Sequence, residues 1–339
     1  MKRFLSLFLA IVMLFGTTAC QNVNQVNNET SNPSEVPNGN INEENSHYPV
    51  TIQNYTSSGE PVEITFEKAP ERVIAVYQNS IETLLALGLE DKIIAASGLD
   101  HDVKDEYKEA FNKVKYYKER PTKEETLGME PDFIVSWSSF FGEKHLGDVG
   151  FWHERGINTY IALNSGMLDK DSIDHEYEDI LNMGKIFNVE DKAKEIVDNM
   201  KSEIEKAREF SKDLESVKAI ILEIEKNNTY RIYGKDSIGG NIATQVGADL
   251  VAKENGTIGA ENLVNLNPEV IFTVYYGDSI DRDDAVNAIM ENPALSSISA
   301  IQNKRVHPII LAEVYASGIR TLDGIKSISK GLYPELHED

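Results

Sequence analysis

Cys20 is the only cysteine in the 339-residue chain, and its thiol follows a leader built for secretion. The leader begins with the basic residues Lys2 and Arg3, continues with an apolar run over residues 4–15, and ends with small residues before the cysteine. This order predicts a signal peptide over residues 1–19. The apolar run is too short for a transmembrane helix, which needs about 20 residues.

A lone thiol directly after such a leader resembles the lipidation cysteine of bacterial lipoproteins. The resemblance implies that Cys20 carries acyl chains such as palmitate and that the protein is anchored to the cell membrane, facing outside. Thr18 and Ala19 fit the family pattern, whereas Thr17 stands where leucine is usual. The alternative is a plain secreted protein with a spare thiol.

Residues 20–48 predict a lipidated, disordered leash between this anchor and the folded body. Asn, Glu, Ser, Gln, Pro and Gly dominate the segment, so it buries too little apolar surface to offset the entropy of ordering. Loss of Lys2 and Arg3 with the leader reduces the 33 basic residues to 31, against 56 acidic residues, for a net charge of about −25. This charge argues against nucleic acid as a partner and against a basic patch that binds anionic lipid.

The body alternates short apolar runs with helical patterns, and this alternation predicts an α/β fold. Runs that are apolar on both faces indicate parallel strands covered on both sides. The expected strands of the first half are residues 72–77, 92–97, 133–137 and 158–163, and those of the second half are 217–224, 229–233, 270–276 and 305–310. Between the halves, apolar residues at three-and-four spacing predict one long helix over residues 188–214, with Asn188 as its N-cap.

These patterns divide the body into an N-terminal α/β lobe at 49–187, a linking helix at 188–214 and a C-terminal α/β lobe at 215–339. Each lobe contains one copy of a matched segment, in which a glutamate is followed by six residues, a proline, an acid and three apolar residues. The copies begin at Glu124 and Glu261. Their equal spacing indicates that the lobes share one architecture and face a common groove.

Several segments, taken in order, resemble a known family. They are VEITFEKAPERVIAVYQNSIETLLALGLEDKIIAAS at 62–97, TLGMEPDFIVSW at 126–137, NPALSSISAIQNKRVHPI at 292–309 and GLYPE at 331–335. On this basis the chain is identified as a member of the helix-linked class of ABC-transporter substrate-binding proteins, which deliver ferric siderophores, haem or cobalamin. The resemblance covers residues 62–337, and Leu295 stands where the family commonly has tryptophan.

The resemblance implies two doubly wound α/β lobes joined by one long backbone helix, with the ligand held between them. It also implies a monomer that works with an ABC permease and its ATPase, and a glutamate on each lobe that docks onto permease arginines. Glu124 and Glu261 fall on those two positions. The alternative for Glu124 is local, because Thr122 and Glu125 have the spacing of a capping box at the start of a helix. Glu124 would then be only an acid in a first helical turn, which favours negative charge.

Loops that leave the strand ends of both lobes should line the ligand groove, as in other open α/β sheets. Aromatic side chains there offer broad, stiff apolar contact, and arginines pair with the oxygens of a metal-bound ligand. The candidates are Tyr77, Gln78, Trp137 and Ser138 in the first lobe, and Arg231, Tyr233, Tyr275, Tyr276, Tyr315 and Arg320 in the second.

For some of these candidates a position that does not contact the ligand is the alternative. One of Tyr275 and Tyr276 is expected in the core, because both end an apolar strand. Arg231 alternates with two tyrosines, so a solvent-facing position is its alternative. For Arg320, at the start of a helix-like segment, the alternative is a surface ion pair.

The expected ligand is a ferric siderophore, with a hydroxamate ahead of a catecholate, because the groove segments hold many aromatic residues and few cations. A ferric tris-catecholate is a trianion and would need several buried cations to offset its desolvation. A cobalamin or haem carrier of the same fold, and a surface lipoprotein receptor for a protein partner, are the alternatives. The sequence contains no catalytic motif and no histidine spacing typical of a metal site, so neither an enzyme nor a resident cofactor is expected.

Overall fold

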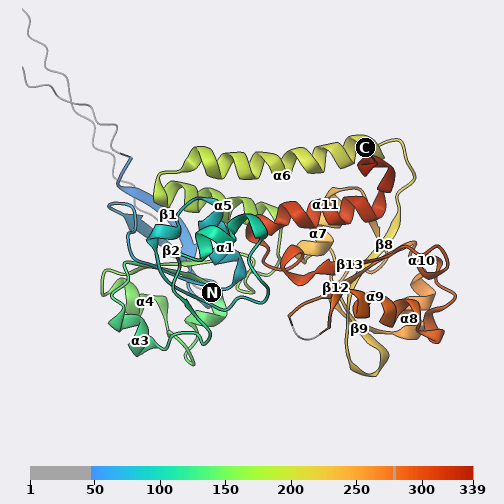
Figure 1. Ribbon diagram of the computed structural model, residues 1–339, viewed down its shortest axis with the longest axis horizontal. Coiled ribbons are helices and arrows are strands. Elements are labelled where there is room, and N and C mark those ends of the chain that lie inside the picture. Colours follow the sequence, from blue (N-terminus) through green and yellow to red (C-terminus); the bar gives the residue numbers. More distant parts are fainter. Residues whose placement is uncertain (1–46, 278–279, 339) are drawn as a thin grey trace, which may run out of the picture. The chain divides into compact units, whose positions relative to one another are not determined.

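The computed structural model describes residues 47–277 and 280–338, and in this part the chain forms two α/β lobes joined by a long helix (Figure 1). The predicted signal peptide, Cys20 and nearly all of the predicted leash lie outside the described residues. Within the described ranges, no helix combines the length and the apolar character needed to span a membrane.

The first lobe is built on a five-stranded parallel sheet in the order β5-β4-β3-β6-β7. Its strands are β3 (Val73–Val76), β4 (Ile93–Ser97), β5 (Tyr116–Tyr117), β6 (Phe133–Ser136) and β7 (Asn158–Ile161), and its helices are α1 (Gln78–Ala86), α2 (Lys108–Phe111), α3 (Lys123–Gly128), α4 (Val149–His153) and α5 (Ile173–Phe187). Every residue of β3 is buried, and alternate β3 residues belong to two different apolar clusters. The predicted parallel sheet, covered on both sides, is therefore confirmed.

An antiparallel hairpin of β1 (Val50–Tyr55) and β2 (Pro61–Phe66) precedes this sheet and was not predicted. Asn54 fastens the hairpin to the edge strand β7. Its side-chain Nδ2 donates to the Ile161 carbonyl at 2.9 Å, and its Oδ1 accepts from the Ile161 N–H at 2.8 Å. One buried amide thus replaces a backbone pairing that the hairpin does not make with β7.

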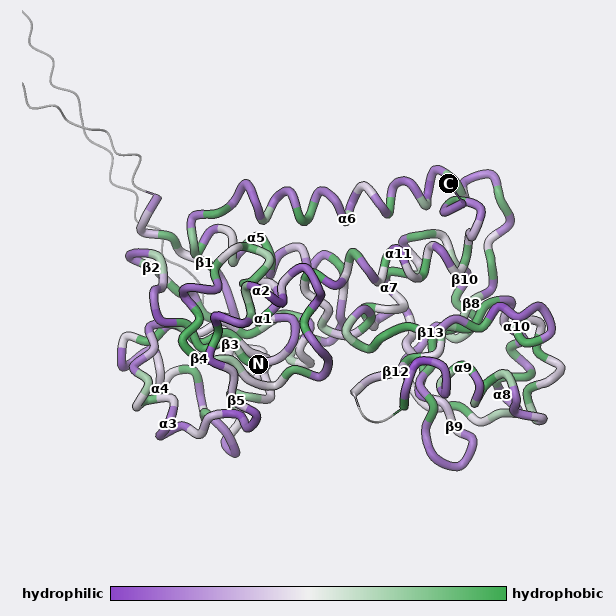
Figure 2. The backbone as a smooth tube through the Cα atoms, viewed as in Figure 1, coloured by the Kyte–Doolittle hydropathy of each residue, from purple (hydrophilic) through white to green (hydrophobic). Residues whose placement is uncertain are grey.

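The long helix α6 (Glu190–Ser211) packs against α5 of the first lobe and α11 (Thr321–Leu332) of the second (Figure 1). Figure 2 shows polar and apolar residues alternating along it. Its buried residues repeat at three-and-four spacing, as an amphipathic helix requires. They are Ala193, Val197, Met200, Ile204 and Ala207. The long helix expected from this spacing is present, although it is shorter at both ends.

The prediction that Asn188 caps α6 is wrong. Asn188 ends α5 instead, with a backbone φ of 56° in the left-handed region that asparagine tolerates at helix ends. Val189 precedes α6 and makes no side-chain cap. The short connection brings the two helices together at Gly184, where a Cβ atom would lie 2.5 Å from the Ala193 Cβ. The sequence pattern could not separate the two helices, because polar residues suit both a helix start and a helix end.

The second lobe contains a mixed sheet in the order β11-β9-β8-β12-β13, with β10 also paired to β8. Its strands are β8 (Lys218–Ile224), β9 (Thr229–Ile232), β10 (Asp249–Leu250), β11 (Gly256–Gly259), β12 (Val270–Tyr275) and β13 (Val306–Ile310), and its helices besides α11 are α7 (Ile238–Gln245), α8 (Ala260–Leu266), α9 (Arg282–Met290) and α10 (Ser299–Gln302). Strands β8, β10, β12 and β13 run parallel. Strand β9 is antiparallel to β8, because the turn Lys226–Asn228 between them is too short for a crossover.

Candidate functional site

An aromatic wall, formed by Tyr77, Trp137 and Tyr315, joins the two lobes. Tyr77 lies between β3 and α1, Trp137 directly follows β6, and Tyr315 lies between the short turns η6 (Leu311–Glu313) and η7 (Gly318–Arg320) of the second lobe. The rings of Tyr77 and Trp137 stack with their centroids 4.4 Å apart, and the indole meets the Tyr315 ring edge-on at 5.6 Å. Three predicted ligand residues from distant segments therefore lie in contact.

Hydrogen bonds fix the first-lobe part of this wall. The Trp137 indole N–H donates to the Asn79 side-chain oxygen at 2.7 Å, and the Tyr77 hydroxyl lies 3.2 Å from the Ser139 hydroxyl. Tyr77 also has a backbone φ of 74°, which is uncommon for a residue with a side chain. Such strained residues cluster at functional sites, where the surrounding structure holds them in place. The wall is therefore largely pre-formed before any ligand arrives.

Arg231 and Tyr233 extend the site into the second lobe. The Arg231 guanidinium carbon lies 5.2 Å from the Tyr233 ring centre and 5.8 Å from that of Tyr315. A nitrogen of the same guanidinium lies 3.6 Å from a Glu223 carboxylate oxygen, which also accepts the Tyr233 hydroxyl at 2.8 Å. Burial, together with Glu223, raises the pKa of Tyr233 far above its usual value, so this hydroxyl stays a neutral donor.

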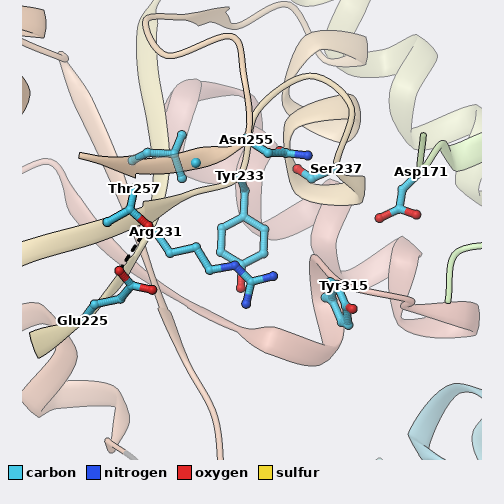
Figure 3. Close-up of a pocket in the computed structure, with 10 residues that line it drawn as sticks. Asp171, Glu225, Arg231, Tyr233, Ser237, Asn255, Thr257 and Tyr315 are labelled. Carbon is cyan, nitrogen blue, oxygen red and sulfur yellow. Dashed lines mark hydrogen bonds between the residues drawn. The ribbon is translucent and has the colours of Figure 1, made fainter. Parts of the chain in front are cut away.

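A cavity of about 420 Å³ opens beside these residues, and its lining includes Asp171, Arg231, Tyr233, Ser237 and Tyr315 (Figure 3). Asp171 is a first-lobe residue, and the others belong to the second lobe, so both lobes contribute to the cavity. Burial, reinforced by the nearby Glu176 carboxylate, raises the pKa of Asp171 to about 7. In Figure 3, the end of the Arg231 side chain lies beside Tyr233, and Asp171 lies nearer to Tyr315.

Seven of the ten predicted ligand residues lie outside this lining. Two of them, Tyr77 and Trp137, belong to the aromatic wall, and the other five are Gln78, Ser138, Tyr275, Tyr276 and Arg320. The Gln78 side-chain oxygen accepts the N–H groups of Asp100 and His101, and the Ser138 hydroxyl donates to the Ser165 carbonyl at 2.6 Å. Tyr275 ends β12 and is partly buried, and Tyr276 pairs with Ile280 in an isolated bridge. Their proposed contacts with a ligand stay predictions.

Arg320 was expected to bind the ligand, but its guanidinium is already paired within the protein. Its Nε and Nη2 atoms donate to the two Glu82 carboxylate oxygens at 2.6 and 2.8 Å, and Nη2 also donates to the Asp102 carbonyl at 2.9 Å. The Arg320 side chain is 10 % exposed and that of Glu82 is fully buried. Arg320 thus forms an ion pair, as the alternative prediction had it. The pair is buried between the lobes, however, and does not lie on the surface.

A second buried carboxylate holds the same C-terminal segment. Glu176 of α5 accepts the backbone N–H groups of Ser317 and Gly318 at 3.0 and 2.6 Å. Gly318 has a φ of 54°, and a Cβ atom there would lie 2.9 Å from the Thr83 hydroxyl of α1. The segment that carries Tyr315 is therefore clamped to two helices of the first lobe.

The two predicted docking glutamates are exposed and lie in the first turns of equivalent helices. Glu124 belongs to α3 and Glu261 to α8, and within the described residues neither side chain has an ion-pair partner. The capping box beside Glu124 is present, because Thr122 and Glu125 exchange hydrogen bonds. Glu124 lies in the first turn that this box opens, where a helix favours negative charge, so the local alternative and the docking role both stay predictions.

Two charged residues of the site, Arg120 and Asp171, were not predicted from the sequence. The Arg120 guanidinium lies 4.8 Å from the Tyr77 ring centre, and no carboxylate among the described residues forms an ion pair with it. Arg120 follows the two-residue strand β5, which no apolar run announced. Asp171 precedes α5 in a polar loop without a motif. If β5 had been predicted, Arg120 would have been among the residues of the strand-end loops that were considered as ligand-binding. No local sequence pattern distinguishes Asp171.

No cluster of three or more His, Cys, Asp or Glu residues is placed to hold a metal ion in the part of the chain that the structure describes. The residues that do form the site are aromatic and polar, with charges of both signs.

Comparison with known proteins agrees with this architecture. Residues 73–309 match the family model described as periplasmic binding protein. A periplasmic binding protein from Veillonella parvula, known from its crystal structure, is 36 % identical over 85 % of this chain and 93 % of its own, with a TM-score of 0.81. The chain therefore belongs to the periplasmic binding protein family, in the helix-linked class. It is a substrate-binding component of an ABC transporter and not an enzyme.

Two Bacillus subtilis proteins are more distant relatives along nearly the whole chain. The ABC transporter substrate-binding lipoprotein YvrC is 24 % identical over 98 % of this chain and 97 % of its own. The petrobactin-binding protein YclQ is 23 % identical over 94 % of both chains. The crystal structure of YclQ covers 86 % of this chain with a TM-score of 0.62.

The contribution of the buried ion pair between Glu82 and Arg320 to stability can be tested by substitution. We expect Glu82→Gln to lower the free energy of unfolding by about 3–5 kcal/mol, because it leaves the Arg320 guanidinium buried without its counter-charge. Arg320→Gln should have a similar effect, and the double variant should lose less than the sum of the two. Urea unfolding measures these differences.

The control for this cycle is Glu71→Gln, which removes an exposed pair with Lys92 and should change stability by less than about 1 kcal/mol. Additive losses in the double variant would contradict the coupling. If Arg320→Gln kept its stability and lost ligand affinity instead, the guanidinium would serve the ligand.

Proposed function

We propose that the protein captures a ferric siderophore between its lobes and delivers it to an ABC importer. The observation that carries this proposal is the aromatic wall of Tyr77, Trp137 and Tyr315 beside a cavity to which both lobes contribute. Stiff aromatic faces suit a rigid chelate, because they offer apolar area at little cost in conformational entropy.

The charges around the cavity favour a neutral hydroxamate over a tris-catecholate. Arg231 is the only cation in the described lining of the cavity, and Glu223 lies beside its guanidinium. A trianionic chelate would lose its hydration without gaining enough cationic partners. Relatives with this fold include the petrobactin-binding YclQ and a protein of an Fe3+-hydroxamate transport system from Saccharomonospora viridis, which is 19 % identical with a TM-score of 0.65.

Haem and cobalamin are the competing ligands within the same fold. A haem-binding protein from Pseudomonas aeruginosa is 19 % identical with a TM-score of 0.59, so the fold alone does not exclude haem. Histidine is absent from the described lining of the cavity, and so one common axial ligand of haem iron is missing there. A surface receptor for a protein partner would not need an enclosed aromatic wall.

The ligand is tested by calorimetric titration of the mature protein with ferrichrome, ferrioxamine, ferric enterobactin, haem and cobalamin. We expect the ferric hydroxamates to bind, and Trp137→Ala to weaken that binding by about 1–3 kcal/mol, because it removes the centre of the wall. The control is Phe210→Ala, whose ring packs on Tyr333 of the second lobe and should not affect affinity. Binding of ferric enterobactin alone would overturn the preference for hydroxamates, and binding of haem or cobalamin alone would overturn the proposal.

We also propose that Glu124 and Glu261 dock the loaded protein onto basic residues of the permease. Exposed carboxylates of this kind steer and orient association and add little raw affinity. We expect Glu124→Ala and Glu261→Ala each to reduce uptake several-fold and the double variant to approach background. Affinity for the ligand should not change.

The matched control for docking is Glu195→Ala, an exposed glutamate on α6. Uptake of the radiolabelled chelate by cells, together with titration of the purified variants, separates the two effects. Equal losses of uptake and of ligand affinity would place these carboxylates in the binding site instead.

We also propose that the protein is anchored by lipid to the outer side of the cell membrane, a proposal that the leader and Cys20 support. We expect Cys20→Ala to abolish acylation, because the thiol that accepts the lipid is gone. The variant should appear in the medium or remain as an unprocessed precursor. Fractionation with mass spectrometry of the N-terminus measures this, and a mature variant that stayed on the membrane would refute the anchor.

A further inference from the structure

The cations next to the cavity lining are already paired with carboxylates, whereas the unpaired Arg120 lies outside that lining, at the Tyr77 end of the aromatic wall. Arg231 faces Glu223 at 3.6 Å. Lys235 lies 3.7 Å from Glu254, and Lys170 lies 3.4 Å from Asp236, the residue before the lining residue Ser237. Two carboxylates of the lining have no cation of their own among the described residues. They are Asp171 and Glu225.

Glu225 is exposed and has other partners. Its carboxylate accepts the hydroxyl groups of Thr229 and Thr257 at 3.4 and 3.2 Å, and water reaches it freely. Asp171 differs, because it is partly buried and its carboxylate accepts no hydrogen bond within the described residues; only its backbone N–H is engaged, with the Asp236 carbonyl at 3.1 Å. Asp171 is thus the carboxylate that a ligand could satisfy.

The surroundings of Asp171 are poor in positive charge. The buried Glu176 carboxylate disfavours the negative charge of Asp171 and so adds to the rise in its pKa. Next to burial, the charge of Asp171 in turn contributes to the raised pKa of the Tyr315 hydroxyl. The Lys170 ammonium group pairs with Asp236, and the Arg231 guanidinium, beside the Tyr233 and Tyr315 rings, faces Glu223. An arriving cation would therefore relieve an existing electrostatic cost.

We propose that the cavity receives a positively charged arm of the chelate and that Asp171 is the counter-ion of that arm. The inference rests on the proposed function, and it narrows the ligand from hydroxamates in general to those with an ammonium group. Asp171 would then determine specificity for the charged arm, whereas contact of the chelate with the aromatic wall would provide the rest of the affinity.

The test compares two chelates that differ only in the charge of one arm. Ferrioxamine B carries a free primary amine, and its N-acetyl derivative is neutral at the same position. We expect wild-type protein to bind the amine form about tenfold more tightly at pH 8, the gain of one charge-assisted hydrogen bond. Asp171→Asn should lose this preference and bind the acetylated chelate as the wild type does. Glu178→Gln, the same charge change at an exposed site on α5, should keep the preference.

The pH dependence gives a second readout. With its pKa raised to about 7, Asp171 is ionised at pH 8 and protonated at pH 5 in the free protein. Lowering the pH should therefore shrink the preference of the wild type for the amine form, whereas Asp171→Asn should show no such change. A preference that stays constant between pH 5 and pH 8 would overturn the role of Asp171.

The outcomes also separate this inference from the proposed function. Equal binding of both chelates by the wild type would refute the charged arm and leave the siderophore proposal intact. Failure of both chelates, and of the other ferric chelates, to bind would refute the proposed function and the inference with it. Weaker binding of both chelates to Asp171→Asn would give the residue a general role in the cavity and contradict its role as a counter-ion.

Discussion

The site depends on two buried carboxylates of the first lobe that hold one segment of the second. Glu82 neutralises Arg320, and Glu176 accepts the N–H groups at the start of the η7 turn. A buried charge without its partner is costly, so this segment has one favourable position. Because Tyr315 precedes η7 on the same segment, the clamp also sets its contact with Trp137. The meeting of the lobes is thus decided by electrostatics, and the aromatic wall follows from it.

Much of the fold was accessible from periodicity. Continuous apolar runs located the buried strands of both lobes, and three-and-four spacing located α6, since these patterns reflect burial directly. The hairpin β1–β2 was missed, because a half-exposed edge element has a weak apolar signal. The reversal at β9 and the capping of α5 by Asn188 were missed for another reason. Both depend on turns of a few residues, where several backbone conformations suit the same sequence.

The site was accessible only in part. The strand-end rule brought Tyr77, Trp137 and Tyr315 into consideration, and the structure places them in contact. The rule could not tell which polar side chains already have partners within the protein. Arg320 is paired with Glu82, whereas the Asp171 carboxylate has no hydrogen-bond or ion-pair partner among the described residues. Pairing is a property of the assembled lobes, so a single sequence does not reveal it.

The position of Trp137 has a spectroscopic consequence. The chain contains two tryptophans, and the other, Trp152, is fully buried within the first lobe. The Trp137 indole stacks on a first-lobe ring and meets a second-lobe ring edge-on, so its emission depends on the spacing of the lobes. The apolar cluster around Trp152 consists of first-lobe residues, so its emission should not depend on the spacing of the lobes. Trp137 is therefore an intrinsic fluorescence probe of lobe movement, and no external label is needed to follow that movement.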